Sequence, residues 1–126
     1  MPYGKAGIYA ITIDFYGKHR VVYVGETTNL YERGAEHIYY TQNAMYLDES
    51  KNKKYYLLLS AQLSGFKVDV EKITECNKYE LKELEDKWIE YYEPPLNVLT
   101  PMGRRDISNY SILDVVMNSM DFKKWK

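Results

Sequence analysis

The chain has 126 residues, enough for one compact domain with a hydrophobic core and too few for two domains of ordinary size. Hydrophobic residues make up 45% and charged residues 28%, which is typical of a globular protein and excludes a disordered segment. The net charge of −1 lacks the basic excess of many nucleic-acid-binding proteins, so a basic face would have to assemble from cations distant in sequence. The candidates are Lys5, Lys18, Arg20, Arg33, Arg104 and Arg105.

The single cysteine, Cys76, excludes an internal disulfide and fits a reducing compartment, and no Cys/His cluster has the spacing of zinc ligands. The N-terminus lacks a charged-then-apolar leader. The longest strongly apolar stretch, around Leu57-Leu58-Leu59, is far too short to span a bilayer. We therefore expect a soluble, cytoplasmic protein.

Two strands are predicted at the start of the chain. Side chains of Gly7–Phe15 alternate between two faces, which is typical of a strand. Tyr16-Gly17-Lys18 is a turn signal, and the β-branched run Arg20–Val24 indicates a second strand. An antiparallel hairpin of these strands places Gly7-Ile8-Tyr9 beside Tyr23-Val24-Gly25.

A helix is predicted after the hairpin. Thr28 or Asn29 is the expected N-cap, and the helix is expected to end at about Tyr40. Arg33 and His37 are then one turn apart on one face of the helix.

The middle of the chain predicts one more helix and one more strand. The helix spans residues 53–63 and is stopped by Gly65, which suits a left-handed C′ position. Phe66–Ile73 alternates apolar and charged residues and is predicted to be the third strand.

The last third of the chain predicts a long helix and a short one. Asn77 with Glu80 marks the start of the long helix, and Pro94-Pro95 ends it at about Tyr92. The short terminal helix is expected within Tyr110–Met120. We expect one α/β (α+β) domain with a small three-stranded antiparallel sheet flanked by helices. In it, residues 1–100 form the core, and the extension 101–126 packs on that core.

Six polar residues stand out by their order and spacing: Tyr9, Tyr23, Arg33, His37, Glu85 and Asn97. Together with the two tripeptides, they resemble the active-site signature of the GIY-YIG endonuclease family. The resemblance covers roughly residues 7–97. The second tripeptide reads YVG rather than YIG, a conservative change. The resemblance implies a GIY-YIG-like nuclease fold and a metal-dependent DNA endonuclease that hydrolyses a phosphodiester bond.

Glu85 is the expected metal ligand, because the resemblance implies one divalent ion, Mg²⁺ or Mn²⁺, held by a single glutamate. Independently, Glu85 is out of pattern within a core-facing stripe formed by Leu81, Leu84, Trp88 and Tyr92. The alternative is a partly buried glutamate that pairs with an arginine or lies at the edge of the stripe.

Arg33 is the expected stabiliser of the transition state, because a guanidinium matches the geometry of phosphate oxygens. The alternative is a surface arginine that pairs with Asn29 or Glu36. For His37 three roles stay open: a proton shuttle, a hydrogen-bond partner for a tyrosine, or a histidine on the helix surface.

Tyr9 is the general base that the resemblance implies. Since an ordinary phenol has a pKa of about 10, we expect Arg33 and the metal to lower the pKa of Tyr9. Tyr23 on the paired strand would hold the water or a phosphate oxygen. The alternative is that both are ordinary strand aromatics in a chain of 14 tyrosines. His19 is interpreted as a turn residue without a catalytic part.

Asn97 is expected to anchor the site, either by locking the backbone or by orienting Glu85. Gly25 should allow close approach of backbone or phosphate, and Thr27 should cap a turn or contact a phosphate. Gly103-Arg104-Arg105 is a candidate grip on a nucleic-acid backbone.

Substrate choice is expected to reside in residues 39–54 and in the tail from Gly103. Tyr39-Tyr40 and Tyr55-Tyr56 are candidates for stacking on unpaired bases, with packing in the core or at the surface as the alternative. DNA is the expected partner, and a single site implies a homodimer or two successive nicks if both strands are cut. The rival functions are a non-catalytic nucleic-acid-binding module that retains the nuclease fold and a protein-interaction domain.

Overall fold

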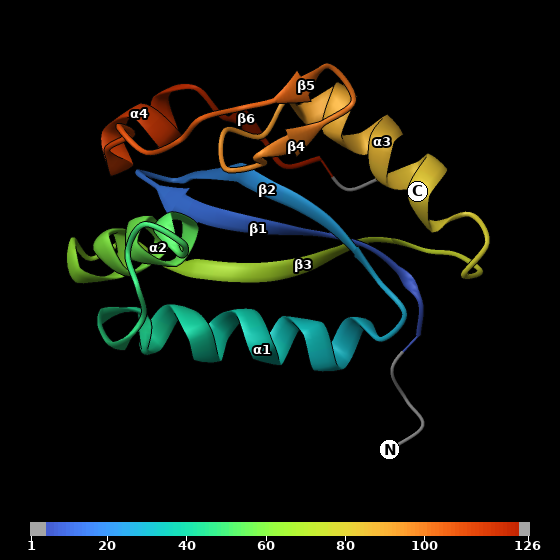
Figure 1. The fold of residues 1–126 in the computed structure, drawn as a ribbon, viewed down its shortest axis with the longest axis horizontal. Helices are drawn as coiled ribbons and strands as arrows, with labels where there is room; N and C mark the ends of the chain where they lie inside the picture. The colour runs from blue at the N-terminus through green and yellow to red at the C-terminus, as the bar shows by residue number, and fades with distance from the viewer. Residues whose placement is uncertain (1–4, 124–126) are drawn as a thin grey trace.

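A computed structural model of the chain describes residues 5–123 (Figure 1). Its main sheet is antiparallel, with four strands in the order β3-β1-β2-β6. The strands are β1 Gly7–Phe15, β2 Lys18–Thr27, β3 Val68–Glu75 and β6 Met120–Asp121. A small hairpin of β4 Leu99–Thr100 and β5 Gly103–Arg104 stands apart.

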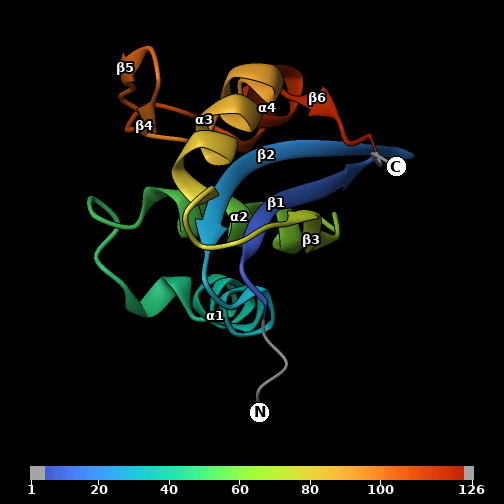
Figure 2. The ribbon, with the colours of Figure 1, turned by 90° about the vertical axis from the view of Figure 1, so that its right-hand side faces the viewer.

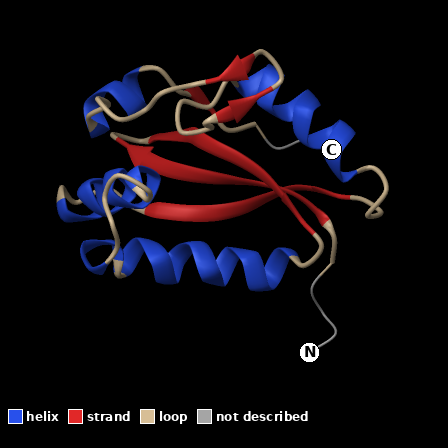
Figure 3. Ribbon diagram, in the orientation of Figure 1, coloured by secondary structure: helices blue, strands red, loops and turns tan. Residues whose placement is uncertain are grey.

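Helices cover both faces of the main sheet, so the protein has mixed α+β architecture. The helices are α1 Leu30–Gln42, the 3₁₀ turn η1 Ala44–Tyr46, α2 Lys53–Leu63, α3 Leu81–Tyr92 and α4 Ile112–Met117. Figures 1 and 3 show α1 and α2 on one side of the sheet and α3 on the other. Within residues 5–123, no helix combines the length and the apolar character needed to cross a membrane.

The prediction of a three-stranded sheet is wrong, because the sheet has a fourth strand. That strand, β6, has only two residues and pairs with Arg20 and Val21 of β2. Its pairing partners lie about a hundred positions earlier, and two residues are too few for a periodic pattern to reveal a strand.

Local signals located most of the other elements. The predicted bounds of β1 and α2 match the structure, and Gly65 has the expected left-handed conformation with φ of +91°. The Asn29 side chain accepts a hydrogen bond from the Glu32 backbone N–H at 3.0 Å and so caps α1. Strand β2 is longer than predicted and includes Gly25.

The tail beyond residue 100 combines predicted and unpredicted structure. Helix α4 lies inside the predicted range Tyr110–Met120, and Ser111 and Asp114 form a capping box at its start. Residues 1–4, at the start of the predicted core, and residues 124–126, at the end of the predicted extension, lie outside the described residues. The division into a core and an extension therefore stays a prediction.

Strand β1 separates two hydrophobic clusters. Tyr9, Ile11 and Ile13 pack toward α2, whereas Ile8 and Ala10 pack toward Trp88 and Ile89 of α3 and their neighbours. Because both faces of β1 are covered, its first seven residues are buried. Catalytic side chains on α1 and α3 would consequently be separated by the sheet, except at an edge.

Strand β2 provides such an edge (Figure 2). Among the described residues, its strand pairing on the side of β6 ends at Val21. Further along, the Leu96 backbone N–H donates to the Val22 carbonyl at 2.9 Å, so the loop after α3 lies along the same edge. Side chains from the two faces of the sheet can meet here.

We predict that Gly7→Ala destabilises the fold by about 1–3 kcal/mol through overpacking. A Cβ at residue 7 would overlap the Thr74 carbonyl oxygen of β3 and press against the Leu30 side chain. Gly34→Ala is the matched control, because its Cβ would meet Val70 at an ordinary 3.6 Å and alanine favours a helix. Urea unfolding measures both, and equal stability of the two variants would contradict the prediction.

Candidate functional site

Tyr9, Tyr23 and His37 form an aromatic cluster beside the edge of β2. The ring centroids are 6.3 Å apart for Tyr9 and Tyr23, and 5.2 Å apart for Tyr9 and His37. Across the hairpin, Tyr9 pairs with Gly25, and a Cβ on Gly25 would overlap the Tyr9 hydroxyl. The glycine of the second tripeptide therefore makes room for the tyrosine side chain of the first, whereas the predicted close approach of backbone or phosphate to Gly25 stays a prediction.

His37 is buried between two phenols. Its side chain is on α1, and the residue is 1% exposed. Nε2 lies 2.6 Å from the Tyr9 hydroxyl oxygen, and Nδ1 lies 2.7 Å from that of Tyr55. Of the three roles considered, a surface histidine is excluded, and a hydrogen-bond partner for a tyrosine is confirmed.

Burial sets the protonation states of this cluster. Burial, followed by the charges of Lys54 and Arg33, lowers the pKa of His37 to about 3. Burial also raises the pKa of Tyr9 above its ordinary value, although Arg33 acts in the opposite direction. Arg33 lowers the pKa of Tyr9 as expected, but burial outweighs its effect, and the lowering expected from a bound metal stays a prediction. At neutral pH both groups are uncharged.

A neutral imidazole between two hydroxyls has one N–H to donate and one nitrogen to accept. In the tautomer with hydrogen on Nδ1, His37 donates a hydrogen bond to the Tyr55 hydroxyl oxygen and accepts one from the Tyr9 hydroxyl. Burial raises the pKa of Tyr55 to about 12, so this phenol also stays protonated.

Arg33 connects the buried cluster to solvent. Its Nη1 donates to Glu36 Oε1 at 3.1 Å, so the alternative ion pair is present. Partial burial lowers the pKa of Arg33, but hydrogen bonding to Tyr9 and Glu36 outweighs this effect and keeps the guanidinium charged. Arg33 is thus in contact with the Tyr9 hydroxyl while its side chain remains 37% exposed.

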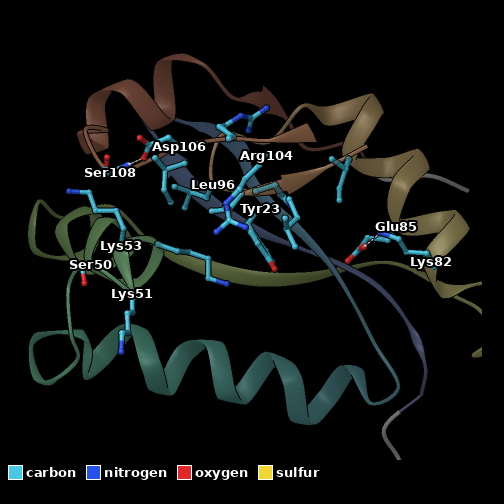
Figure 4. A pocket seen from close by; sticks show the side chains of 17 residues that line it. Tyr23, Ser50, Lys51, Lys53, Lys82, Glu85, Leu96, Arg104, Asp106 and Ser108 are labelled. Carbon is cyan, nitrogen blue, oxygen red and sulfur yellow. Dashed lines mark hydrogen bonds and ion pairs between the residues drawn. The ribbon is translucent and has the colours of Figure 1, made fainter. Parts of the chain in front are cut away.

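Glu85 reaches the same edge from the opposite face of the sheet. Figure 4 shows Tyr23 and Glu85 extending from β2 and α3 into one cleft. The charge of Glu85 raises the pKa of Tyr23, second only to burial, which places the carboxylate near that phenol. Its ion-pair partner is Lys82, with Nζ 3.6 Å from Oε1, rather than an arginine.

The donor set at Glu85 fits a hard divalent cation. Burial raises the pKa of Glu85, Lys82 opposes this shift, and the charge of Glu26 on β2 adds to it. A bound cation would offset the repulsion between the Glu85 and Glu26 carboxylates. Hard divalent cations prefer oxygen ligands of this kind. Within the described chain no group of three or more His, Cys, Asp or Glu side chains could hold a metal.

Asn97 locks the backbone, which was one of its two predicted roles. Its Oδ1 accepts from the Val24 N–H at 2.9 Å, and its Nδ2 donates to the Val24 carbonyl at 2.8 Å. The amide thus supplies the hydrogen bonds of a neighbouring strand at a buried position. In the part of the chain that the structure describes, Asn97 makes no hydrogen bond to Glu85.

The cleft has a volume of about 880 Å³, and basic side chains dominate its charged lining. Among the lining residues, the basic ones are Lys51, Lys53, Lys54, Lys82, Arg104 and Arg105, and the acidic ones are Glu85 and Asp106. Tyr23 and Asn97 also line the cleft, whereas Tyr9, Arg33 and His37 do not. Tyr23 therefore forms the boundary between the cleft and the buried cluster.

This basic surface matches the predicted one only in part, through Arg104 and Arg105. Lys5 pairs with Glu75 and Arg20 pairs with Asp121, both away from the cleft. The cleft draws its cations from α2, from Lys82 of α3, and from β5 and the residues beside these elements.

Thr27 and the two arginines have different local roles. Thr27 Oγ1 accepts from the Asn29 N–H at 3.0 Å, so it caps the turn before α1. Arg105 donates to the Pro94 carbonyl and holds the loop after α3. Arg104 is exposed in the cleft wall and free to meet a ligand.

Sequence reasoning missed the position of Lys54 in the cleft and the bond from Tyr55 to His37. Lys54 Nζ lies 4.0 Å from the centroid of the Tyr23 ring and 4.8 Å from that of Tyr55. Tyr55 is buried, which removes it from the candidates for base stacking. A signal was available: Lys54 stands at helical spacing from Leu57, Leu58 and Ala61, an apolar stripe in which a cation is out of pattern.

Comparisons of the chain with protein-family models, with curated proteins and with solved structures found no match. The likeness to GIY-YIG nucleases consequently depends on the residues and their arrangement.

We predict that His37 stays neutral through the physiological pH range. Its pKa of about 3 lies below the ordinary value of 6.5, so the stability that neutral His37 contributes is present above pH 6.5 and is lost as the pH falls toward 3. Imidazole ¹⁵N shifts against pH measure this directly, and His37→Gln assigns the signal. A midpoint near the ordinary value would contradict the prediction.

Proposed function

We propose that the chain is a divalent-metal-dependent endonuclease of the GIY-YIG type that hydrolyses DNA phosphodiester bonds. The observation that carries the proposal is that Glu85 and Arg33, from opposite faces of the sheet, both act by their charges on the Tyr23 phenol at one edge of β2. The β1–β2 hairpin between α1 and α3 supports a GIY-YIG-like fold. A protein-interaction domain gives no reason for a half-buried carboxylate at this edge.

Charge favours a polyanionic substrate. The cleft gathers six basic and two acidic side chains, in a chain whose net charge is −1. Neutralising phosphate charge releases counterions and supplies most sequence-independent affinity for nucleic acids. DNA is therefore the substrate class that fits the cleft best.

Hydrolysis of a phosphodiester needs a positioned water, a base and positive charge on the developing oxygens. Tyr23 forms the floor of the cleft, and its hydroxyl holds the water or a phosphate oxygen. Arg33 stabilises the transition state through its planar fork of donors.

Tyr9 and His37 form the proton path. The water gives its proton to the Tyr9 oxygen, and the Tyr9 hydroxyl proton passes to His37 Nε2. The resulting hydroxide attacks phosphorus, the bond to the leaving oxygen breaks, and that oxygen departs with the electron pair and takes a proton from solvent water. A bound phosphate offsets the charges of Lys54 and Arg33 that lower the pKa of His37, so substrate binding makes His37 a better proton acceptor.

The metal site and the anchor complete the proposed machinery. Glu85 would hold Mg²⁺ or Mn²⁺, and the bound ion supplies positive charge for the leaving oxygen. Asn97 fixes the loop after α3 against Val24 and so sets where the end of α3 meets the hairpin. Arg104 contacts the nucleic-acid backbone at the cleft wall.

One observation favours the rival function, a nucleic-acid-binding module without catalysis. Burial raises the pKa of Tyr9, which disfavours a general base in the protein alone. This rival keeps the basic cleft and predicts DNA binding without cleavage, so catalysis must be tested separately from binding.

We predict that the native chain nicks supercoiled plasmid with Mg²⁺ or Mn²⁺. Glu85→Gln and Arg33→Gln should each lower the single-turnover rate by about 10²-fold or more, as loss of transition-state stabilisation does. Glu83→Gln is the matched control, because Glu83 lies on the same helix with its side chain exposed. Its rate should equal the native rate.

Gel-shift binding in EDTA accompanies the assay, with circular dichroism to check the fold. If the native chain binds plasmid but leaves it intact in both metals, the binding module replaces the endonuclease. If Glu85→Gln cleaves at the native rate, the assignment of the metal ligand is wrong.

A further inference from the structure

Lys54 occupies an unusual position at the start of α2. It stands on the core-facing stripe of the helix, next to Tyr55, yet its side chain lines the cleft. Its Nζ lies over the Tyr23 ring at 4.0 Å from the centroid, which is a cation–π contact. The ammonium group is thus held at the boundary between the cleft and the buried cluster.

The groups that face Lys54 are neutral or cationic. They are Tyr23 from β2, its neighbour Tyr55, and His37 and Arg33 from α1. Within residues 5–123, Lys54 has no carboxylate partner, whereas Lys53 pairs with Glu49 at 3.5 Å. Burial and then the charge of Arg33 lower the pKa of Lys54 to about 8.

A partly buried cation without a counter-ion, beside a second cation, is unfavourable for folding. Such an arrangement is retained where a ligand supplies the missing negative charge. A phosphate is the ligand whose charge two neighbouring cations satisfy together.

Other cations of the cleft lack these features. In Figure 4, Lys51 and Lys53 extend outward from the start of α2, away from Tyr23. Arg105 is engaged with the Pro94 carbonyl. Lys54 is therefore the cation best placed to act with Arg33 on a single group.

We propose that Lys54 is a substrate-binding residue that, together with Arg33, clamps one backbone phosphate of a nucleic acid over the Tyr23 ring. This inference rests on the proposed function. Tyr23 acts as a platform that fixes the position of the ammonium group. The clamp places that phosphate beside Tyr9 and His37, where the proton path begins.

Fluorescence anisotropy in EDTA tests the clamp, because a labelled DNA duplex then binds without cleavage. Lys54→Met should weaken binding about 10-fold and reduce the salt dependence of log affinity by about one unit of slope, the amount expected for one lost phosphate contact. Lys54→Arg should retain both. Lys87→Met is the matched control, since Lys87 also lies over an aromatic ring, that of Trp88, but outside the cleft.

Stability separates a binding role from a structural one. Lys54→Met should melt at the same temperature as the native chain or higher, because it removes an unpaired cation. Native affinity should also fall as the pH rises through about 8, where Lys54 loses its charge, while the affinity of Lys54→Arg should not. Lost binding together with a lower melting temperature would assign a structural role and overturn the inference.

Failure of the inference is distinguishable from failure of the proposed function. If the native chain cleaves DNA while Lys54→Met keeps native affinity and salt slope, the clamp is refuted and the nuclease stands. If the native chain neither binds nor cleaves DNA, inorganic pyrophosphate is the second probe. Thermal stabilisation by pyrophosphate in the native chain, and not in Lys54→Met, would then support the anion site alone.

Discussion

The structure depends on how the edge of β2 is closed. Within residues 5–123, strand β6 pairs only with Arg20 and Val21. Beyond them the sheet continues through a side chain, because the Asn97 amide bonds both backbone groups of Val24. Because those groups are buried, leaving them unpaired would cost about 1–3 kcal/mol each. The same bonds bring the loop after α3 to the strand that carries Tyr23. A fold requirement therefore also joins the two faces of the sheet at the candidate site.

Burial and charge act against each other at this edge. The phenols of Tyr9 and Tyr55 and the imidazole between them are uncharged because they are buried. Arg33 and Lys54 meet them as cations, and only Arg33 has a carboxylate partner among the described residues. A cluster with excess positive charge and neutral proton carriers is suited to an anionic substrate. In the proposed function, binding of such a substrate changes the protonation chemistry of the buried residues.

Short-range patterns predicted much of this architecture. Patterns among neighbouring residues predicted the β1 strand, the helix from Lys53 to Leu63 and the turn at Gly65. The structure contains all three. Strand β6 and the β4–β5 hairpin have two residues per strand and depend on partners or turns rather than on periodicity. The large effect of burial on the pKa of Tyr9 was not foreseen, because spacing shows which charges are near but not how deeply a group is buried. Lys54 was missed although its place on an apolar stripe resembles that of Glu85.

A crystal structure of the chain with Mn²⁺ and a DNA duplex carrying a non-hydrolysable phosphate linkage tests the central claim most directly. The account predicts anomalous scattering from Mn²⁺ at the Glu85 carboxylate and a backbone phosphate at the edge of β2, in contact with Arg33 and Lys54 above Tyr23. A manganese ion distant from Glu85, or a duplex bound on another face with the edge of β2 empty, would contradict it.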